Sequence, residues 1–183
     1  MLRLFQLLIL TYFLLLFASC HSKSGRRIVD ENQNLIKGYV IGVIDGDTYD
    51  LLIDNNLTVR IRMEGIDAPE KGMPFYRVAK NYLSQNCFNK EIRIQKTGQD
   101  DRGRILAFTF VDNIELSHEM IKAGLAWHFK KYNSDHDLAL LETEARKLKK
   151  GLWNDNNPIP PWEIRKIRRQ GISTKNLFDN TKK

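Results

Sequence analysis

Between residues 35 and 63, hydrophobic and polar positions follow the pattern of three short β-strands. The run 36–44 is rich in β-branched and aromatic residues, and 48–53 is a second such run. After the turn-forming sequence Asp54-Asn55-Asn56, hydrophobic residues alternate with polar ones over 57–63. The pattern predicts a three-stranded meander joined by tight turns.

A helix and two further strands are predicted next. Pro74 suits the first turn of the helix, and one helical face is hydrophobic: Phe75, Val78, Ala79, Tyr82 and Leu83. The two strands are predicted at 91–96 and 105–111, and the second ends in the turn Asp112-Asn113.

Two helices complete the pattern. Ser117 is a candidate cap for a short helix ending at Gly124. Ser134 and Asp137 resemble a capping box that opens a longer helix, which stops at Gly151. The residues of this helix expected to face inward are Leu138, Leu141, Ala145 and Leu148.

Five strands with about three helices predict an α+β fold that is mainly β. Because tight turns rather than crossover helices join the first three strands, a small closed barrel of the OB type is favoured over a parallel sheet. We expect this domain to occupy residues 35–154. Residues 155–183 begin with an extended proline- and tryptophan-containing segment and continue as a basic tail with little core-forming pattern.

The N-terminus predicts export. Residues 1–19 carry a single charge, Arg3, before an apolar run over 7–17 that is too short for a comfortable membrane span. Small residues directly before Cys20 resemble a bacterial lipoprotein cleavage site, with Cys20 lipidated and 20–34 acting as a tether. An ordinary signal-peptide site with an incidental cysteine is the alternative. The expected location is the cell envelope, with the membrane contacted only through the lipid anchor.

The cysteine count and the distribution of charge bear on disulfide bonding and on the class of binding partner. If Cys20 is lipidated, Cys87 has no partner and no intrachain disulfide forms; pairing of the two is the alternative. The net charge of +7 comes from the C-terminal end, where residues 145–183 hold 11 basic and 3 acidic side chains. A polyanionic partner or an anionic lipid surface would each explain that excess.

Acidic residues at two bends suggest a site. Asp45 and Asp47 flank a glycine that allows a sharp bend, although an isolated Asp-Gly-Asp is more often a solvated turn. Its spacing does not fit an EF-hand loop. Asp67 and Glu70 also fit a helix capping box, but Gly72 and the proline that follows would interrupt such a helix.

Two arginines accompany these acids. Arg62 lies on the face of its strand opposite Ile61 and Met63, and Arg104 follows Gly103. Taken singly, each arginine is as readily explained as an exposed, solvated side chain as by a function. Phosphodiesters resist attack because their own charge repels nucleophiles, so a hard cation on carboxylates together with two planar guanidiniums would offset that obstacle.

Taken in order, these sequences resemble the staphylococcal nuclease family over residues 35–154. The resemblance is carried by Ile44-Asp45-Gly46-Asp47-Thr48, by Arg62 five residues before Asp67-Ala68-Pro69-Glu70, and by Arg102-Gly103-Arg104-Ile105-Leu106-Ala107. Gly124-Leu125-Ala126 and Gly151-Leu152-Trp153 fit the family as well.

The resemblance implies a calcium-dependent phosphodiesterase on an OB-fold that cleaves DNA and RNA and leaves 3′-phosphate ends. Asp47, Asp67 and the backbone carbonyl of Ala68 would bind Ca²⁺ directly, and Asp45 would support these ligands without touching the ion. Glu70 would act as general base. Arg62 and Arg104 would grip the scissile phosphate.

Substrate contacts are expected to depart from the family pattern. Arg102 stands where the family commonly has an aromatic residue, and Lys130 where it has a tyrosine, whereas Tyr132 matches a site tyrosine. Charge would then partly replace base stacking. His128 is a possible rival base, but without a second histidine or cysteine at ligand spacing no zinc site is predicted.

We therefore expect a monomeric Ca²⁺-dependent nuclease without an obligate protein partner, acting on single-stranded or locally opened DNA and RNA. Two alternatives stay open. One is a nucleic-acid-binding module that keeps the barrel without the chemistry, and the other is an envelope protein whose basic tail binds lipid or polyanions.

Overall fold

The computed structural model describes residues 35–174 and 177–178. The predicted signal peptide, the tether and Cys20 lie outside the described residues. Within the described part, none of the helices combines the length and the apolar character needed to cross a bilayer.

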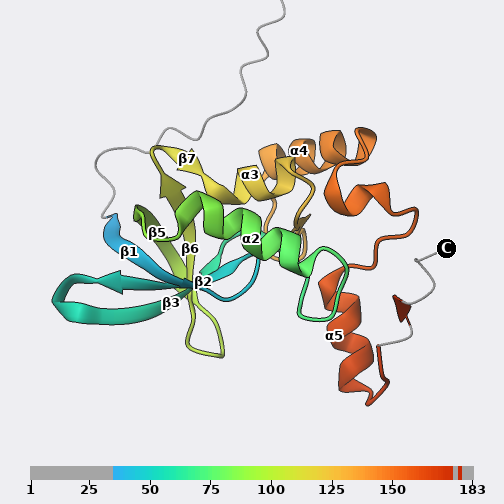
Figure 1. The fold of residues 1–183 in the computed structure, drawn as a ribbon, viewed down its shortest axis with the longest axis horizontal. Helices are drawn as coiled ribbons and strands as arrows, with labels where there is room; N and C mark the ends of the chain where they lie inside the picture. The colour runs from blue at the N-terminus through green and yellow to red at the C-terminus, as the bar shows by residue number, and fades with distance from the viewer. Residues whose placement is uncertain (1–34, 175–176, 179–183) are drawn as a thin grey trace, which may run out of the picture.

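A closed β-barrel forms one half of the molecule (Figure 1). Its main sheet has the order β3-β2-β1-β5-β6-β7, and a parallel pairing of β3 with β6 closes the barrel. The predicted meander and the predicted OB-type barrel are therefore confirmed. The strands of this sheet are β1 (Ile36–Val43), β2 (Thr48–Ile53), β3 (Leu57–Met63), β5 (Glu91–Gln99), β6 (Ile105–Val111) and β7 (Ile114–Glu115).

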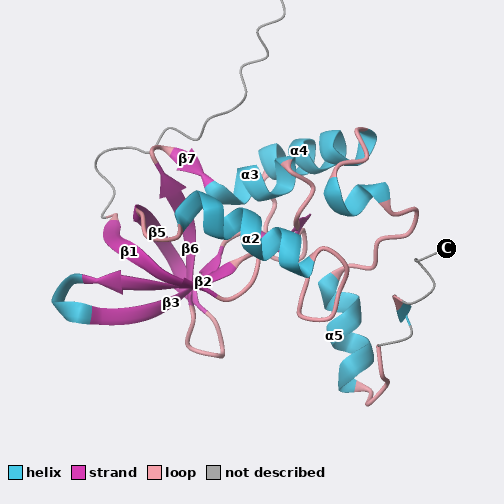
Figure 2. Ribbon diagram, in the orientation of Figure 1, coloured by secondary structure: helices cyan, strands magenta, loops and turns pink. Residues whose placement is uncertain are grey.

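Helices lie along one side of the barrel and beyond its end (Figure 2). A small second sheet pairs β4 (Ile66–Asp67) with β8 (Trp127–His128) in antiparallel fashion. The helices are α2 (Tyr76–Cys87), α3 (Leu116–Lys122), α4 (His136–Lys147) and α5 (Pro161–Arg169), with 3₁₀ turns η1 (Asp54–Asn56) and η2 (Gly151–Asn154).

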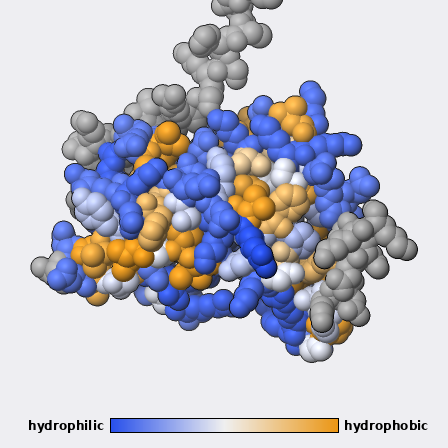
Figure 3. Space-filling model, in the orientation of Figure 1, coloured by the Kyte–Doolittle hydropathy of each residue, from blue (hydrophilic) through white to orange (hydrophobic). Residues whose placement is uncertain are grey.

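The main core fills the barrel and the space under α2, α3 and α4. Tyr49, Ile61, Leu83 and Leu138 are fully buried in it, one from each of β2, β3, α2 and α4. Leu57 is 55% exposed at the start of β3, on the β2–β3 hairpin, where Figure 3 shows hydrophobic residues at the surface. Burial along β3 does not alternate: only its last three residues, Ile61–Met63, are buried.

Three local predictions are corrected. Ser117 is not a cap but lies inside α3, where its hydroxyl donates to the carbonyl of Glu64 at 2.9 Å. Asp135, rather than Ser134, caps α4, because its carboxylate accepts the N–H groups of the second and third following residues. Leu148, expected to face inward, lies after the last residue of α4 and is 54% exposed.

Gly124 and Gly151 pack against each other. The carbonyl of Gly124 accepts the N–H of Leu152 at 2.8 Å, and a Cβ on Gly124 would lie 2.3 Å from the carbonyl oxygen of Lys150. Both glycines also have positive φ. The two motifs flanking α4 thus fasten η2 to the end of α3.

Helix α5 corrects the predicted basic tail. Pro161 occupies its first turn, where a missing N–H costs nothing, and Ile164 is completely buried. Ile164 enters a second core cluster with Met73, Trp127, Ala145, Leu152 and Trp153. The sequence of this helix suggests a solvated tail because only Pro161 and Ile164 are buried and most of its other positions are charged.

Candidate active site

The turn between β1 and β2 carries Asp47, which contacts the loop after β4. Gly46 makes the approach possible, since a Cβ there would lie 2.8 Å from the Cβ atoms of both Ala68 and Ala79. The N–H of Ala68 donates to Asp47 Oδ2 at 2.6 Å, and the N–H of Asp47 donates to Asp45 Oδ1 at 3.1 Å. Two distant motifs are thereby joined.

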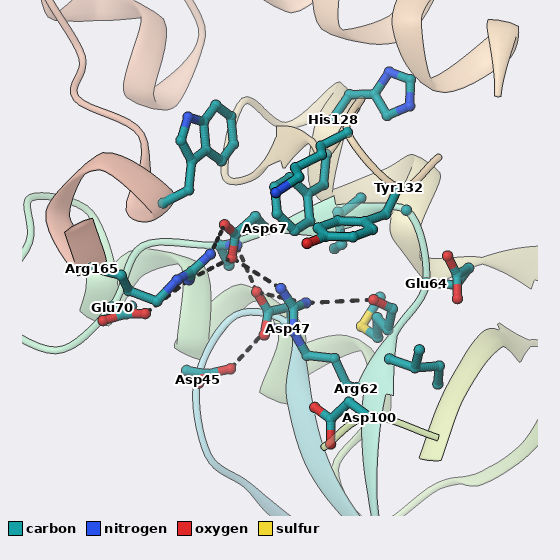
Figure 4. Close-up of a pocket in the computed structure, with 18 of the residues that line it drawn as sticks. Asp45, Asp47, Arg62, Glu64, Asp67, Glu70, Asp100, His128, Tyr132 and Arg165 are labelled. Carbon is teal, nitrogen blue, oxygen red and sulfur yellow. Dashed lines mark hydrogen bonds and ion pairs between the residues drawn. The ribbon is translucent and has the colours of Figure 1, made fainter. Parts of the chain in front are cut away.

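Arg62 links the two aspartates predicted to bind metal. Its Nη1 lies 2.9 Å from Asp47 Oδ2 and its Nη2 lies 2.9 Å from Asp67 Oδ1 (Figure 4). The arginine is on the strand face opposite Ile61, as expected, but that face borders the site and the residue is only 9% exposed. A planar guanidinium suits this bridge because it presents two donors at once.

Asp67 ends the short strand β4, whose pairing with Trp127 in β8 fixes its position. Its side chain is 2% exposed and lies at the centre of the interactions drawn in Figure 4. Glu70, three residues on, is more accessible at 30% of its side chain. Burial suits Asp67 to a structural or metal-ligand role, whereas the accessible Glu70 is suited to proton transfer.

Two arginines of α5 reach this pair. Arg165 Nη2 lies 2.6 Å from Asp67 Oδ2, and its Nη1 lies 3.1 Å from Asp67 Oδ1 and 2.9 Å from Glu70 Oε1. Arg168 Nη1 contacts Glu70 Oε2 at 3.1 Å. Sequence reasoning missed both. The sequence feature that could have revealed them is Pro161, which is suited to a helix start, followed by Ile164 three residues later. Such a helix carries Arg165 and Arg168 one turn apart.

Arg104 lines the same cavity and is held by an acid of its own loop. Asp100 Oδ2 accepts from Arg104 Nε at 2.7 Å and lies 2.7 Å from Nη2, while Nη1 points to Thr48 Oγ1 at 3.4 Å. Asp100, which was not predicted, thus fixes one edge of the guanidinium. The hydrogen bonds and charge of Arg104 lower the pKa of Asp100 despite the opposing effect of partial burial.

The crowded acids have raised pKa values. Burial first, and then the neighbouring charge of Asp47, raise the pKa of Asp45 to about 7. Burial also raises the pKa of Asp67, although the hydrogen bonds from Arg165 and the charge of Arg62 oppose that rise. Excess negative charge of this kind is stabilised by cations.

All ten predicted site residues of the described chain line one cavity of about 1200 Å³. The structure therefore brings the acids, the arginines and the three expected substrate contacts together, while their individual roles stay predictions. The ten are Asp45, Asp47, Arg62, Asp67, Ala68, Glu70, Arg102, Arg104, Lys130 and Tyr132.

The expected substrate contacts differ in how they are held. Lys130 Nζ lies 2.7 Å from the buried carboxylate of Glu142, whereas Arg102 is exposed. Tyr132 is 69% exposed and packs edge-on against Phe129. His128, the rival base, is 3% exposed, and its Nε2 is 3.1 Å from Asn133 Oδ1.

The donor set suits a hard cation with few protein ligands. The described residues contain no group of three or more histidine, cysteine, aspartate or glutamate side chains placed to hold a metal ion. Asp47 and Asp67 nevertheless converge through Arg62, and both offer oxygen donors only. Two carboxylates and a carbonyl fit an ion that keeps water and phosphate among its ligands.

Comparisons with known proteins agree with this geometry. The family model described as "Staphylococcal nuclease homologue" matches residues 60–155. An "Uncharacterized endonuclease" of Escherichia coli is 38% identical over 128 residues, covering 69% of this chain and 83% of that protein. A "Micrococcal nuclease" of Shigella flexneri is 32% identical over 148 residues, covering 75% and 84%.

A further "Uncharacterized endonuclease", from Haemophilus influenzae, is 35% identical over 127 residues, covering 69% of this chain and 71% of that protein. The matched range 60–155 includes Arg62, Asp67, Glu70 and Arg104 but ends before α5. On the match, the barrel and the converging site, the chain belongs to the staphylococcal nuclease family and is a nuclease that hydrolyses phosphodiester bonds.

Proposed function

We propose that this nuclease is a calcium-dependent endonuclease that hydrolyses DNA and RNA and leaves 3′-phosphate ends. The observation that carries the proposal is the bridge that Arg62 makes between the buried carboxylates of Asp47 and Asp67, at 2.9 Å on each side. Paired acids and a fixed guanidinium at one point suit a cation and a phosphate together.

Asp47, Asp67 and the carbonyl of Ala68 would hold Ca²⁺, and Asp45 would support Asp47 through the hydrogen bond to its backbone N–H. When bound, the ion supplies positive charge that offsets the charge of the phosphodiester. The 2.6 Å hydrogen bond from the N–H of Ala68 to Asp47 Oδ2 fixes the orientation of the Asp47 carboxylate.

Glu70 would accept the proton of the attacking water. Its side chain is 30% exposed, against 6% for Asp47 and 2% for Asp67, as a proton acceptor in contact with water requires. Asp47 and Asp67 both contact the Arg62 guanidinium at 2.9 Å, and this convergence makes them the primary ligands.

Arg62 and Arg104 would donate to the phosphate from two sides. Arg62 is fixed by its carboxylates, and Asp100 holds the Nε–Nη2 edge of Arg104. One N–H of Arg104 Nη1 is directed to Thr48 Oγ1, which leaves the other for a phosphate oxygen. Donors fixed before the reaction stabilise charge that develops in the transition state without reorganisation.

Single-stranded or locally opened nucleic acid is the proposed substrate form, because the exposed ring of Tyr132 offers a stacking face that paired bases do not reach. Export and lipidation at Cys20 are further proposals. Mass measurement of the protein from a bacterial membrane fraction, with and without Cys20→Ala, tests the anchor.

A metal-dependence assay tests the function. The full chain in non-ionic detergent is given plasmid DNA, a single-stranded oligonucleotide and RNA, each with Ca²⁺, with Mg²⁺ and with a chelator. We expect cleavage of all three in Ca²⁺ alone, faster for single strands, and products that require a phosphatase before 3′-end extension. Equal rates in chelator would refute calcium dependence, and 3′-hydroxyl products would refute the reaction proposed.

Binding without turnover in any metal would instead favour the non-catalytic module. The acids and arginines that line one cavity argue against that alternative.

A further inference from the structure

Helix α5 lies beyond the range 60–155 matched by the family model, yet it is a fixed wall of the active-site cavity. Buried Ile164 anchors its inner side. The ring of Trp162 stacks on Phe129 with centroids 5.4 Å apart and an interplanar angle of 13°. The residues after the matched range therefore form a surface next to the site rather than a free tail.

The outer side of α5 is cationic. The helix carries four basic residues and one acid, Glu163. Two of the four form ion pairs in the site, Arg165 with Asp67 and Arg168 with Glu70. The other two, Lys166 and Arg169, are exposed and line the cavity. Within the described residues Arg169 forms no ion pair, and the contact of Lys166 with Glu163 is a loose one at 4.0 Å.

The facing segment continues this pattern. Lys131 and Tyr132 line the same cavity, and Lys131 Nζ lies 5.1 Å from the centre of the Tyr132 ring. Among residues 35–174 and 177–178, no carboxylate lies within ion-pair distance of Lys131. Each side of the cavity thus carries exposed cations and an aromatic ring. We call this surface the basic–aromatic wall: Lys131, Tyr132, Trp162, Lys166 and Arg169.

The chemistry of the basic–aromatic wall selects one occupant. Exposed cations track a phosphate backbone, and aromatic faces stack on unpaired bases, so the combination fits a single-stranded polynucleotide. A cavity of about 1200 Å³ is also larger than the pockets of roughly 300–1000 Å³ that hold one small ligand. A lipid surface would need no concave, aromatic-lined groove.

We propose that the basic–aromatic wall binds a strand of the substrate several nucleotides away from the scissile phosphate, which makes this nuclease prefer polymers to short substrates. The inference rests on the proposed function. It assigns to α5 a role in substrate choice and leaves the reacting groups to the barrel.

The test compares Lys131→Gln/Arg169→Gln with the wild type and with a control pair of equal charge change, Lys37→Gln/Lys96→Gln. The control residues are exposed on β1 and β5 and do not line the cavity. Binding of a labelled single-stranded 20-mer to the full chain in detergent is followed by anisotropy from about 50 to 200 mM salt, with a chelator present to prevent hydrolysis.

Loss of two phosphate contacts should lower the slope of log affinity against log salt by about 1.4 and weaken binding about tenfold, whereas the control pair should match the wild type. Hydrolysis with Ca²⁺ should show a raised KM for the 20-mer at unchanged kcat. Hydrolysis of a dinucleotide should be unaffected.

A slope equal to that of the control pair would overturn the proposal. So would an equal loss on the dinucleotide, because the cations would then act at the reacting phosphate. If the wild type hydrolyses neither substrate in Ca²⁺ while the difference in salt slope persists, the proposed function fails and the strand-binding surface stands.

Discussion

Arg165 and Asp67 form a two-pronged ion pair between residues 98 positions apart, with Nη2–Oδ2 at 2.6 Å and Nη1–Oδ1 at 3.1 Å. Asp67 Oδ1 also accepts from Arg62. Both oxygens of a candidate calcium ligand are therefore already in contact with guanidinium groups, one of them supplied from outside the family match.

This contact predicts that Arg165→Gln tightens calcium binding. A cation at Asp67 must displace or approach the Arg165 guanidinium, and a hydrogen bond to a charged group is worth about 1.5–3 kcal/mol net. We expect about tenfold tighter Ca²⁺ binding by isothermal titration calorimetry at pH 8 without nucleic acid. Arg169→Gln, which removes the same charge from the same helix without a carboxylate contact, is the control.

Weaker binding in Arg165→Gln than in Arg169→Gln would show the opposite role, in which Arg165 holds Asp67 and Glu70 in position for the ion. The sign of the change therefore separates competition from support.

Arg62 should prove necessary for stability as well as activity. Removing one partner from a buried ion pair costs about 3–5 kcal/mol, so Arg62→Gln should lower the free energy of unfolding by that order. Arg62→Lys keeps the charge but cannot bridge two carboxylates, and should cost about 1–3 kcal/mol. Arg60→Lys on the same strand is the matched control, because its pair with Asp50 is 51% exposed on the arginine side.

Urea unfolding of the three variants measures these differences. An Arg60→Lys cost similar to that of Arg62→Lys would contradict the assignment of Arg62 as a buried bridge, since exposed pairs contribute about 0–1 kcal/mol.

The sequence predicts the barrel well because its signals are local. β2 (Thr48–Ile53) and β6 (Ile105–Val111) begin and end where the hydrophobic runs do. β5 extends three residues past the predicted Lys96, through Gln99, because its pairing with β6 continues across a register shift beside Gly98. Cross-strand pairing rather than side-chain pattern sets that boundary.

The site is predictable only in part. Family motifs identify Asp47, Asp67 and Glu70, and the cavity joins them. The partners of these acids are not visible locally: Arg165 follows Asp67 by 98 positions in a segment whose charge suggests solvation. Only Pro161 and Ile164 of helix α5 are buried, and burial of so few side chains by a distant cluster leaves no periodic signal.

Cys87 should be unreactive in the folded protein. It is completely buried, and burial raises the pKa of its thiol to about 12 against the opposing charge of Lys90. The thiolate is the reactive form, so the full chain carrying Cys20→Ser should react with a disulfide reagent at pH 8 only in denaturant. Rapid reaction under native conditions would contradict the burial.

The same shift predicts a pH dependence. The folded thiol keeps its proton above pH 9.0, where an unfolded thiol loses it, so stability from this group is full below that pH and declines from there to about pH 12. The decline should be smaller in Cys87→Ala, with unfolding free energies of both proteins measured by urea titration across this range. Parallel declines would show that other groups cause the loss.

Gly46→Ala should disturb the site and the fold together. The new Cβ would lie 2.8 Å from the Cβ atoms of Ala68 and Ala79, neither of which can rotate away. Overpacking of this kind costs about 1–3 kcal/mol, and the turn that carries Asp47 would shift away from Ala68. Gly42→Ala, whose Cβ would meet only the Asp50 side chain at 3.7 Å, is the control for thermal unfolding and calcium titration. Equal effects of the two substitutions would refute the close approach.

Glu70→Gln should abolish most turnover while leaving the fold intact. The amide preserves the shape of the side chain but cannot take up a proton, and loss of a general base lowers kcat by about 10²–10⁴. Glu64→Gln is the matched control: it lines the same cavity, and its Oε2 accepts the Thr97 hydroxyl at 2.7 Å without touching the site acids. kcat and KM are measured in saturating Ca²⁺ for both variants, with unfolding curves alongside. A Glu70→Gln enzyme that keeps more than about a tenth of the wild-type kcat would move the base role elsewhere, and His128, buried on the same cavity, would be the next residue to substitute.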